Sequence, residues 1–157
     1  MEYSKIDKLG VNPSLLGFGC MRFPKKEDGT IDEVEAERML DHAIESGVTY
    51  IDTAYPYHDG ESEPFVGRVL KKYKRKDYYL ATKLPMFKIN SLEQAKEIFE
   101  EQMKRLDVNY VDFYLLHALN KDTWKKVMDL NIIPYCEELK KQGRIKNFGF
   151  SFHDDYE

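Results

Sequence analysis

Residues 111–117 have the sequence VDFYLLH, an apolar run from Val111 to Leu116 that ends in a histidine. A strand that is apolar on both faces is typical of a parallel sheet that is covered on both sides. Four similar runs occur along the chain, with helix-like stretches between them: Leu15–Cys20, Thr49–Thr53, Tyr78–Thr82 and Ile145–Phe150. This alternation predicts parallel strands joined by right-handed helical crossovers.

The stretches between the strands carry helix signals. Apolar residues repeat with a helical period, and capping residues mark the ends. The clearest start is Ser91, which has Gln94 at capping-box spacing. We expect helices over Ile31–Ser46, over Glu63–Tyr73 with Ser62 as N-cap, from Ser91 to Leu106, and from about Asn131 to Gln142. Asn120–Leu130 is either a loop or a short helix, and Ser4–Val11 is a small hairpin.

The spacing of the strands indicates the architecture. They begin near residues 15, 49, 78, 110 and 145, with a mean step of 32.5 residues. Eight such units would take about 260 residues, close to the roughly 250 of a typical (β/α)8 barrel. The sequence therefore predicts an α/β fold of the TIM-barrel type with about the first five strands and four helices. We expect residues 1–157 to be the N-terminal part of one barrel domain, and a compact open five-stranded sheet is the alternative.

The composition indicates a packed domain and argues against several partners. Hydrophobic residues make up 42% of the 157 positions, and the net charge is −4 with both signs spread along the chain. This balance disfavours nucleic acid and acidic membrane surfaces as partners. No segment approaches the roughly 18 apolar residues of a membrane helix. Cys20 and Cys136 lie far apart without metal-ligand spacing, which predicts reduced thiols in the cytoplasm and no metal site.

Residues with polar or reactive side chains follow each expected strand, which is where a barrel places its function. In chain order they are Met21, Asp52 with Tyr57 shortly after it, Lys83, His117 and Ser151. Any one of these residues alone is more often structural. The series as a whole favours an active site at the carboxyl ends of the strands.

Several of these segments resemble motifs of the aldo-keto reductase family. Residues 51–57, IDTAYPY, resemble the family's Asp-Thr-Ala-x-x-Tyr segment, with Gly67 ten residues on. Residues 81–83, ATK, resemble its lysine strand, and residues 111–117 resemble its histidine strand. The first and fifth strand exits, GFGCM at 17–21 and GFS at 149–151, also match and are similar to those of a bacterial subgroup.

The resemblance implies a catalytic tetrad of Asp52, Tyr57, Lys83 and His117. A carbonyl that accepts a hydride needs a proton donor at the developing alkoxide, and a phenol such as Tyr57 can supply it. An ammonium nearby favours the phenolate form, so Lys83 is expected beside the phenol, with Asp52 holding Lys83 charged and oriented. His117 would orient the carbonyl oxygen or share in the proton transfer. Tyr55 lies three residues after Asp52 rather than five and is expected to pack.

The resemblance also implies a nicotinamide cofactor, NADP(H) or alternatively NAD(H), because no side chain supplies a hydride. The residues expected on the cofactor side are Gly19, Cys20, Met21, Asp52 and Ser151. Family members often have Asn after this serine, whereas Phe152 follows it here.

The sequence thus predicts an oxidoreductase that reduces the carbonyl of a small aldehyde or ketone to an alcohol. An inactive partial barrel that acts as a binding or assembly module is the alternative, because unpaired edges at Leu15–Cys20 and Ile145–Phe150 would invite self-association. A Schiff-base enzyme using Lys83 is a third hypothesis. His58, Asp59 and His153 lie near the expected mouth, where we expect solvated loop residues.

Overall fold

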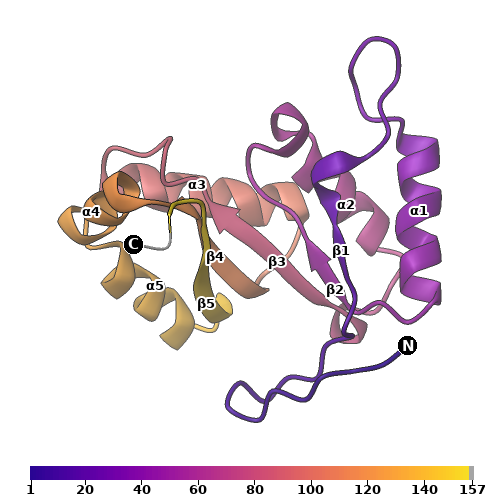
Figure 1. Cartoon of the computed structure of the whole chain (residues 1–157), viewed down its shortest axis with the longest axis horizontal. Helices are drawn as coiled ribbons and strands as arrows, with labels where there is room; N and C mark the ends of the chain where they lie inside the picture. Colours follow the sequence, from indigo (N-terminus) through magenta and orange to yellow (C-terminus); the bar gives the residue numbers. More distant parts are fainter. Residues whose placement is uncertain (156–157) are drawn as a thin grey trace.

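One parallel sheet organises the chain, and its strands lie side by side in chain order (Figure 1). The computed structural model describes residues 1–155. Sequential parallel neighbours joined by right-handed crossovers place their helices on one face, whereas a doubly wound sheet reverses its strand order. The arrangement therefore favours the barrel interpretation over the open sheet. The strands are β1 Gly17–Gly19, β2 Tyr50–Asp52, β3 Tyr79–Leu84, β4 Val111–Leu119 and β5 Ile145–Phe152.

Within residues 1–155 the chain forms five α-helices rather than the predicted four. The additional helix is α4, over the segment that the sequence left open between a loop and a short helix. A capping box between Asn120 and Thr123 starts it and decides between the two alternatives. The helices are α1 Glu33–Glu45, α2 Ser62–Leu70, α3 Leu92–Leu106, α4 Lys121–Asp129 and α5 Ile132–Lys141, with short 3-10 turns η1 Cys20–Arg22, η2 Tyr57–Gly60 and η3 Arg75–Asp77.

The two predicted N-caps have different outcomes. Ser91 caps α3 as expected, and its side chain accepts a hydrogen bond from the amide of Gln94. The prediction for Ser62 was wrong, because this residue is the first residue of α2 and is buried. Its hydroxyl bonds to the hydroxyl of Thr53 and donates to the carbonyl of Cys20. Ser62 therefore ties the start of α2 to the segments that follow β1 and β2.

Three strands extend further than predicted. β3, β4 and β5 continue to Leu84, Leu119 and Phe152, so Lys83, His117 and Ser151 lie inside strands rather than beyond them. Cross-strand pairing explains the extension, since Lys83 is paired with Leu115 and Leu116 with Phe150. β1 is shorter than predicted because the chain turns into η1 at Cys20.

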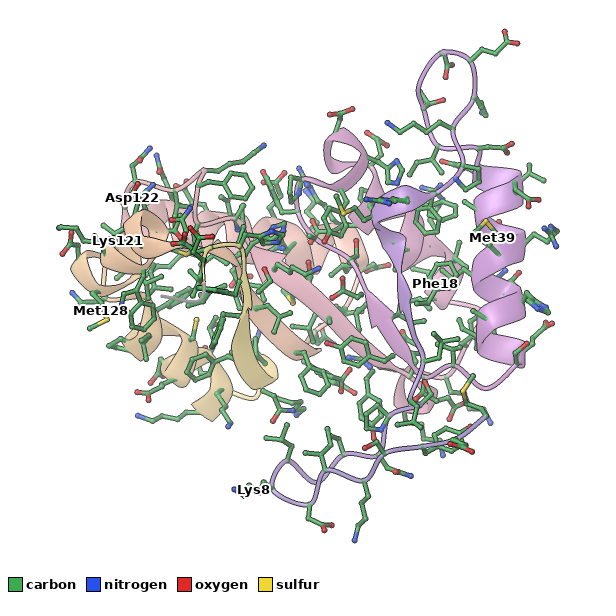
Figure 2. All side chains as sticks on the ribbon, viewed as in Figure 1. Lys8, Phe18, Met39, Lys121, Asp122 and Met128 are labelled. Atoms are coloured by element: carbon green, nitrogen blue, oxygen red, sulfur yellow. The ribbon has the colours of Figure 1, made fainter. Side chains whose placement is uncertain are left out.

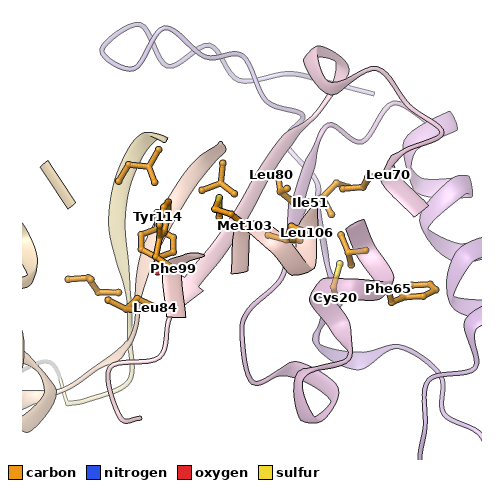
Figure 3. Packing of buried hydrophobic residues seen from close by; sticks show 14 of the residues in the cluster. Cys20, Ile51, Phe65, Leu70, Leu80, Leu84, Phe99, Met103, Leu106 and Tyr114 are labelled. Carbon is orange, nitrogen blue, oxygen red and sulfur yellow. The ribbon is translucent and has the colours of Figure 1, made fainter. Parts of the chain in front are cut away.

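Apolar side chains fill the space between the helices and the sheet (Figure 3). Strand residues such as Ile51 and Leu80 are fully buried against residues from α2 and α3. The two helices approach closely at Gly67, where a Cβ atom would lie 2.6 Å from the carbonyl oxygen of Leu106. The cluster shown includes Cys20, Phe65, Leu70, Leu84, Phe99, Met103, Leu106 and Tyr114.

The predicted N-terminal hairpin is confirmed. Ile6 and Val11 form an antiparallel bridge, and the Ile6 amide donates to the Val11 carbonyl. The hairpin projects from the rest of the chain with Lys8 near its tip (Figure 2). Among residues 1–155, no helix has both the length and the apolarity that crossing a membrane requires.

Candidate active site

Lys83 connects the predicted tetrad. β3 places it at the carboxyl end of the sheet with only 5% of its surface exposed. Its Nζ atom donates hydrogen bonds to Asp52 Oδ1 at 2.5 Å, to the carbonyl of Thr53 at 2.9 Å and to the hydroxyl of Tyr57 at 3.0 Å. An ammonium has three N–H donors, and each of them has an acceptor here. The arrangement suits the charged form of the lysine.

Asp52 anchors this ammonium. It ends β2, where the register places it opposite Gly19 of β1 and Ala81 of β3. Burial raises the pKa of the Asp52 carboxyl, and the positive charge of Lys83 opposes that rise. Breaking a buried ion pair leaves an uncompensated charge, so the pair fixes the position of both groups.

Tyr57 and His117 complete the cluster. The two rings meet edge to face with their centroids 5.8 Å apart, and Lys83 Nζ lies 4.7 Å from the centre of the tyrosine ring. Burial lowers the pKa of His117 to about 4, and the charge of Lys83 and the neighbouring His153 add to the effect. The imidazole is therefore neutral near neutral pH, with one ring nitrogen as donor and the other as acceptor. The structure thus brings all four predicted residues together from β2, η2, β3 and β4.

The residues expected on the cofactor side lie in two places. Gly19 and Met21 are exposed at the end of β1. Cys20 lies between them, but its side chain is fully buried, and burial raises the pKa of its thiol far above the usual value. Ser151 lies in β5, where its hydroxyl oxygen accepts a hydrogen bond from the amide of Ala118 at 2.8 Å. This bond supports β4 where its pairing with β5 shifts register.

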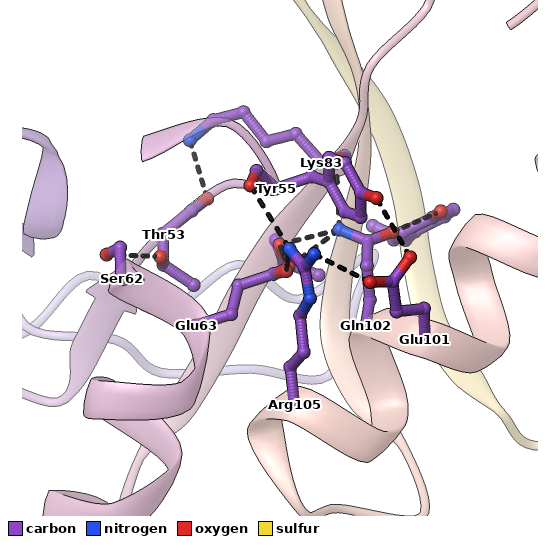
Figure 4. A network of polar contacts seen from close by, with 10 residues as sticks. Thr53, Tyr55, Ser62, Glu63, Lys83, Glu101, Gln102 and Arg105 are labelled. Atoms are coloured by element: carbon purple, nitrogen blue, oxygen red, sulfur yellow. Dashed lines mark hydrogen bonds and ion pairs between the residues drawn. The ribbon is translucent and has the colours of Figure 1, made fainter. Parts of the chain in front are cut away.

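A buried polar network behind Lys83 was not predicted (Figure 4). Its centre is Glu63 of α2, which is fully buried and accepts hydrogen bonds from the Thr82 hydroxyl and the Gln102 side chain, both at 2.7 Å. Gln102 also donates to the carbonyl of Lys83 at 3.0 Å and accepts from Tyr114. The network therefore holds the main chain of Lys83 from the helix side.

Arg105 of α3 extends this network to the loop before Tyr57. Its guanidinium pairs with Glu101 at 2.6 Å and lies 4.2 Å from the centre of the Tyr55 ring. The Tyr55 hydroxyl donates to Glu101 at 2.8 Å, so this tyrosine packs and bonds away from Lys83, as expected. An acidic residue in the first turn of a helix is usual, so Glu63 gave no local signal of this network.

The expectation for His58 was wrong. Its ring is not a solvated loop group, because Nε2 accepts a hydrogen bond from the amide of Phe23 at 3.1 Å and Nδ1 is buried. No local pattern around His58 predicts that the turn bends back toward η1. Among residues 1–155, no group of three or more His, Cys, Asp or Glu side chains is arranged to hold a metal ion.

Comparison with known proteins identifies the family. Residues 15–157 match the model of the aldo/keto reductase family. The chain belongs to the aldo-keto reductase family. It is 35% identical over 125 residues to an aldo-keto reductase of Bacillus subtilis, and 31% identical over 155 residues to a probable aldo-keto reductase of Glycine max. These alignments cover 74% and 94% of this chain, but 38% and 44% of the relatives.

Solved aldo-keto reductases share the fold. The holo form of the enzyme from Bacillus halodurans has a TM-score of 0.79 at 34% identity, over 97% of this chain and 50% of that one. A putative aldo-keto reductase from Pseudomonas aeruginosa has a TM-score of 0.81 at 26% identity, over 96% of this chain and 60% of that one. The chain therefore spans about half the length of the relatives it matches, and the predicted barrel-type fold is confirmed.

Proposed function

We propose that this protein is an NADP(H)-dependent oxidoreductase that reduces aldehyde or ketone carbonyls to alcohols, with Tyr57 as general acid and base. The observation that carries the proposal is the contact between Lys83 Nζ and the Tyr57 hydroxyl at 3.0 Å. An ammonium at this distance stabilises a phenolate, so the phenol can give up its proton and later regain it. Membership of the aldo-keto reductase family supports the same reaction.

The end of β1 fits a nicotinamide nucleotide. A Cβ atom on Gly19 would meet no other atom within 4 Å, so the main chain there is open to a flat ring. Gly19, Cys20 and Met21 would hold the group through their main chain, with Asp52 and Ser151 on the same side. When bound, NADP(H), or alternatively NAD(H), supplies the hydride.

The remaining chemistry belongs to the side chains. Hydride addition to a carbonyl carbon leaves an alkoxide, and Tyr57 donates the proton that converts it to an alcohol. Lys83 compensates the negative charge that this leaves on the phenol oxygen, and Asp52 keeps the ammonium in place. Neutral His117 carries one N–H donor, which can bind the carbonyl oxygen and orient it without adding a second positive charge.

The test compares two tyrosines that are two residues apart. The purified protein is mixed with NADPH and a panel of aldehydes and ketones, and the loss of NADPH absorbance is followed. Tyr57→Phe should lower kcat by about 100-fold or more, the usual contribution of a general acid. Tyr55→Phe is the matched control, because its hydroxyl bonds to Glu101 rather than to Lys83. Equal turnover by Tyr57→Phe and the wild-type protein would refute the proposal.

The same geometry argues against Schiff-base chemistry. A lysine that attacks a carbonyl must be neutral, whereas all three donors of Lys83 face acceptors, one of them a carboxylate. We therefore expect no covalent product when the protein is treated with borohydride and a carbonyl compound.

A further inference from the structure

The turn that follows Tyr57 has an unusual backbone. His58, Asp59 and Gly60 have φ angles of +52°, +56° and +95°, so three successive residues adopt the left-handed region. Two of the three are not glycine, and residues with a Cβ atom disfavour this conformation. Such a turn persists only where surrounding contacts hold it.

The contact that holds this turn comes from the segment after β1. His58 Nε2 accepts a hydrogen bond from the amide of Phe23, with 3.1 Å between the two nitrogen atoms. The two rings pack with their centroids 5.6 Å apart. Phe23 is only 4% exposed and meets Phe65 of α2 edge to face at 5.0 Å. The histidine is therefore bonded to a residue that is itself fixed in the core.

This bond joins two parts of the active site. Phe23 directly follows η1, which contains Cys20 and Met21, and His58 directly follows Tyr57. We propose that His58 is a positioning residue for Tyr57. Its neutral imidazole accepts a hydrogen bond from the amide of Phe23 and so fixes the turn that carries the phenol against the segment after β1. The inference rests on the proposed function, in which Tyr57 is the proton donor.

The bond depends on the protonation state of His58. Nε2 can accept a hydrogen bond only while no proton is attached to it. The ring must therefore be neutral, with its single proton on Nδ1, which is buried. Burial and the positive charge of Lys25, from the loop after η1, lower the pKa of His58. Asp59 on the same turn and the carbonyl groups of Cys20 and Met21 oppose the shift. Protonation of Nε2 would place its N–H group opposite the N–H group of Phe23. Two donors cannot form a hydrogen bond with each other, so the bond would break and the turn would be released.

An NMR titration tests the inference without requiring turnover. The 157-residue protein is labelled on its amides and on its tyrosine rings, and the Phe23 amide and Tyr57 ring signals are followed from neutral into acidic pH. In the wild-type protein both signals should shift together with the titration of His58. In His58→Gln, whose amide oxygen accepts a hydrogen bond but does not titrate, the shift of the Phe23 amide should be lost. The Tyr57 ring signal should keep only the shift near pH 4 that the neighbouring His117 causes. A Tyr57 ring signal that ignores the titration of His58 would overturn the inference.

Kinetics separate this inference from the proposed function. His58→Leu should lower kcat for carbonyl reduction by about 10- to 100-fold with a smaller change in KM, because a misplaced proton donor slows chemistry more than binding. His58→Gln should restore kcat and lose the acid-side fall of the pH profile that His58 causes. If Tyr57→Phe leaves reduction unchanged, the proposed function fails while the NMR result still stands. If the wild-type protein reduces carbonyls and His58→Leu matches it in kcat, only the positioning role fails.

Discussion

At the residue scale, His117 links the candidate active site to the stability of the fold. Its pKa falls from 6.5 to about 4 on folding because the ring is buried and faces Lys83. Between pH 4 and 6.5 the unfolded chain binds more protons at His117 than the folded chain does. The free energy of unfolding is therefore highest above about pH 6.5, as far as His117 determines it, and falls as the pH falls toward 4. We expect the free energy of unfolding to decrease by up to about 3 kcal/mol over this range. Urea unfolding at a series of pH values measures it.

His117→Gln is the control, because glutamine fills similar space and does not titrate. The variant should lose the part of the pH dependence that His117 causes. His58, whose pKa is also lowered, leaves a part of the same sign, and the carboxyls of Asp52 and Glu63, whose pKa is raised by burial, leave a part of opposite sign. A pH dependence of unchanged size in His117→Gln would show that other groups cause it.

The residue scale also shows what the sequence could and could not predict. Asp52, Tyr57, Lys83 and His117 were predicted because they are reactive side chains near the carboxyl ends of the expected strands in the order of a family motif. The structure brings them together, and their catalytic role stays a prediction. Their supporting groups were not found, because Glu63 and Gln102 are ordinary helix residues until two helices and a strand bring their side chains within 2.7 Å. Contacts of this kind depend on tertiary packing, which no local pattern records.

At the element scale, the packing of α2 on α3 depends on Gly67. Its Cβ position lies 2.6 Å from the carbonyl oxygen of Leu106, which is main chain at the end of α3 and cannot rotate away. Gly67→Ala should therefore destabilise the fold by about 1–3 kcal/mol, as overpacking does, despite the higher helix propensity of alanine. Gly149→Ala is the matched control, because the nearest atom to its Cβ lies at an ordinary 3.5 Å. Thermal unfolding of both variants tests this, and equal melting temperatures would contradict it.

The type of each helix or strand could be predicted from the sequence better than its length. Apolar runs located all five strands, because burial on both faces leaves a strong signal. The carboxyl ends of β3, β4 and β5 were predicted too early, since Lys83, His117 and Ser151 are polar and were expected beyond the strands, whereas β1 and β2 end one residue before their predicted ends. In the structure Lys83 bonds to Asp52 of β2, and Ser151 accepts a hydrogen bond from the amide of Ala118 in β4. The parallel pairing of the strands continues to Leu84, Leu119 and Phe152, past all three residues.

At the scale of the whole molecule, the two outer strands lead to a prediction about how the 157-residue chain behaves in solution. Within residues 1–155, β1 and β5 lie at the edges of the sheet. Large apolar side chains are exposed beside both edges: Leu15 and Leu16 at 63% and 61%, and Phe150 and Phe152 at 62% and 55%. Open edges with apolar side chains are templates for pairing with a second chain.

We therefore expect this chain to self-associate in a concentration-dependent way, as light scattering would show. Phe150→Lys should shift the distribution toward monomer, because a charge beside an edge strand opposes pairing. Lys146→Arg, on the same strand, keeps its charge and should leave the distribution unchanged. A monomer at all concentrations with one cooperative melt would mean that the edges are protected, and it would remove the physical basis for an assembly role. Association that Phe150→Lys does not weaken would place the interface away from β5, and the β1 edge beside Leu15 and Leu16 would be the next site to test.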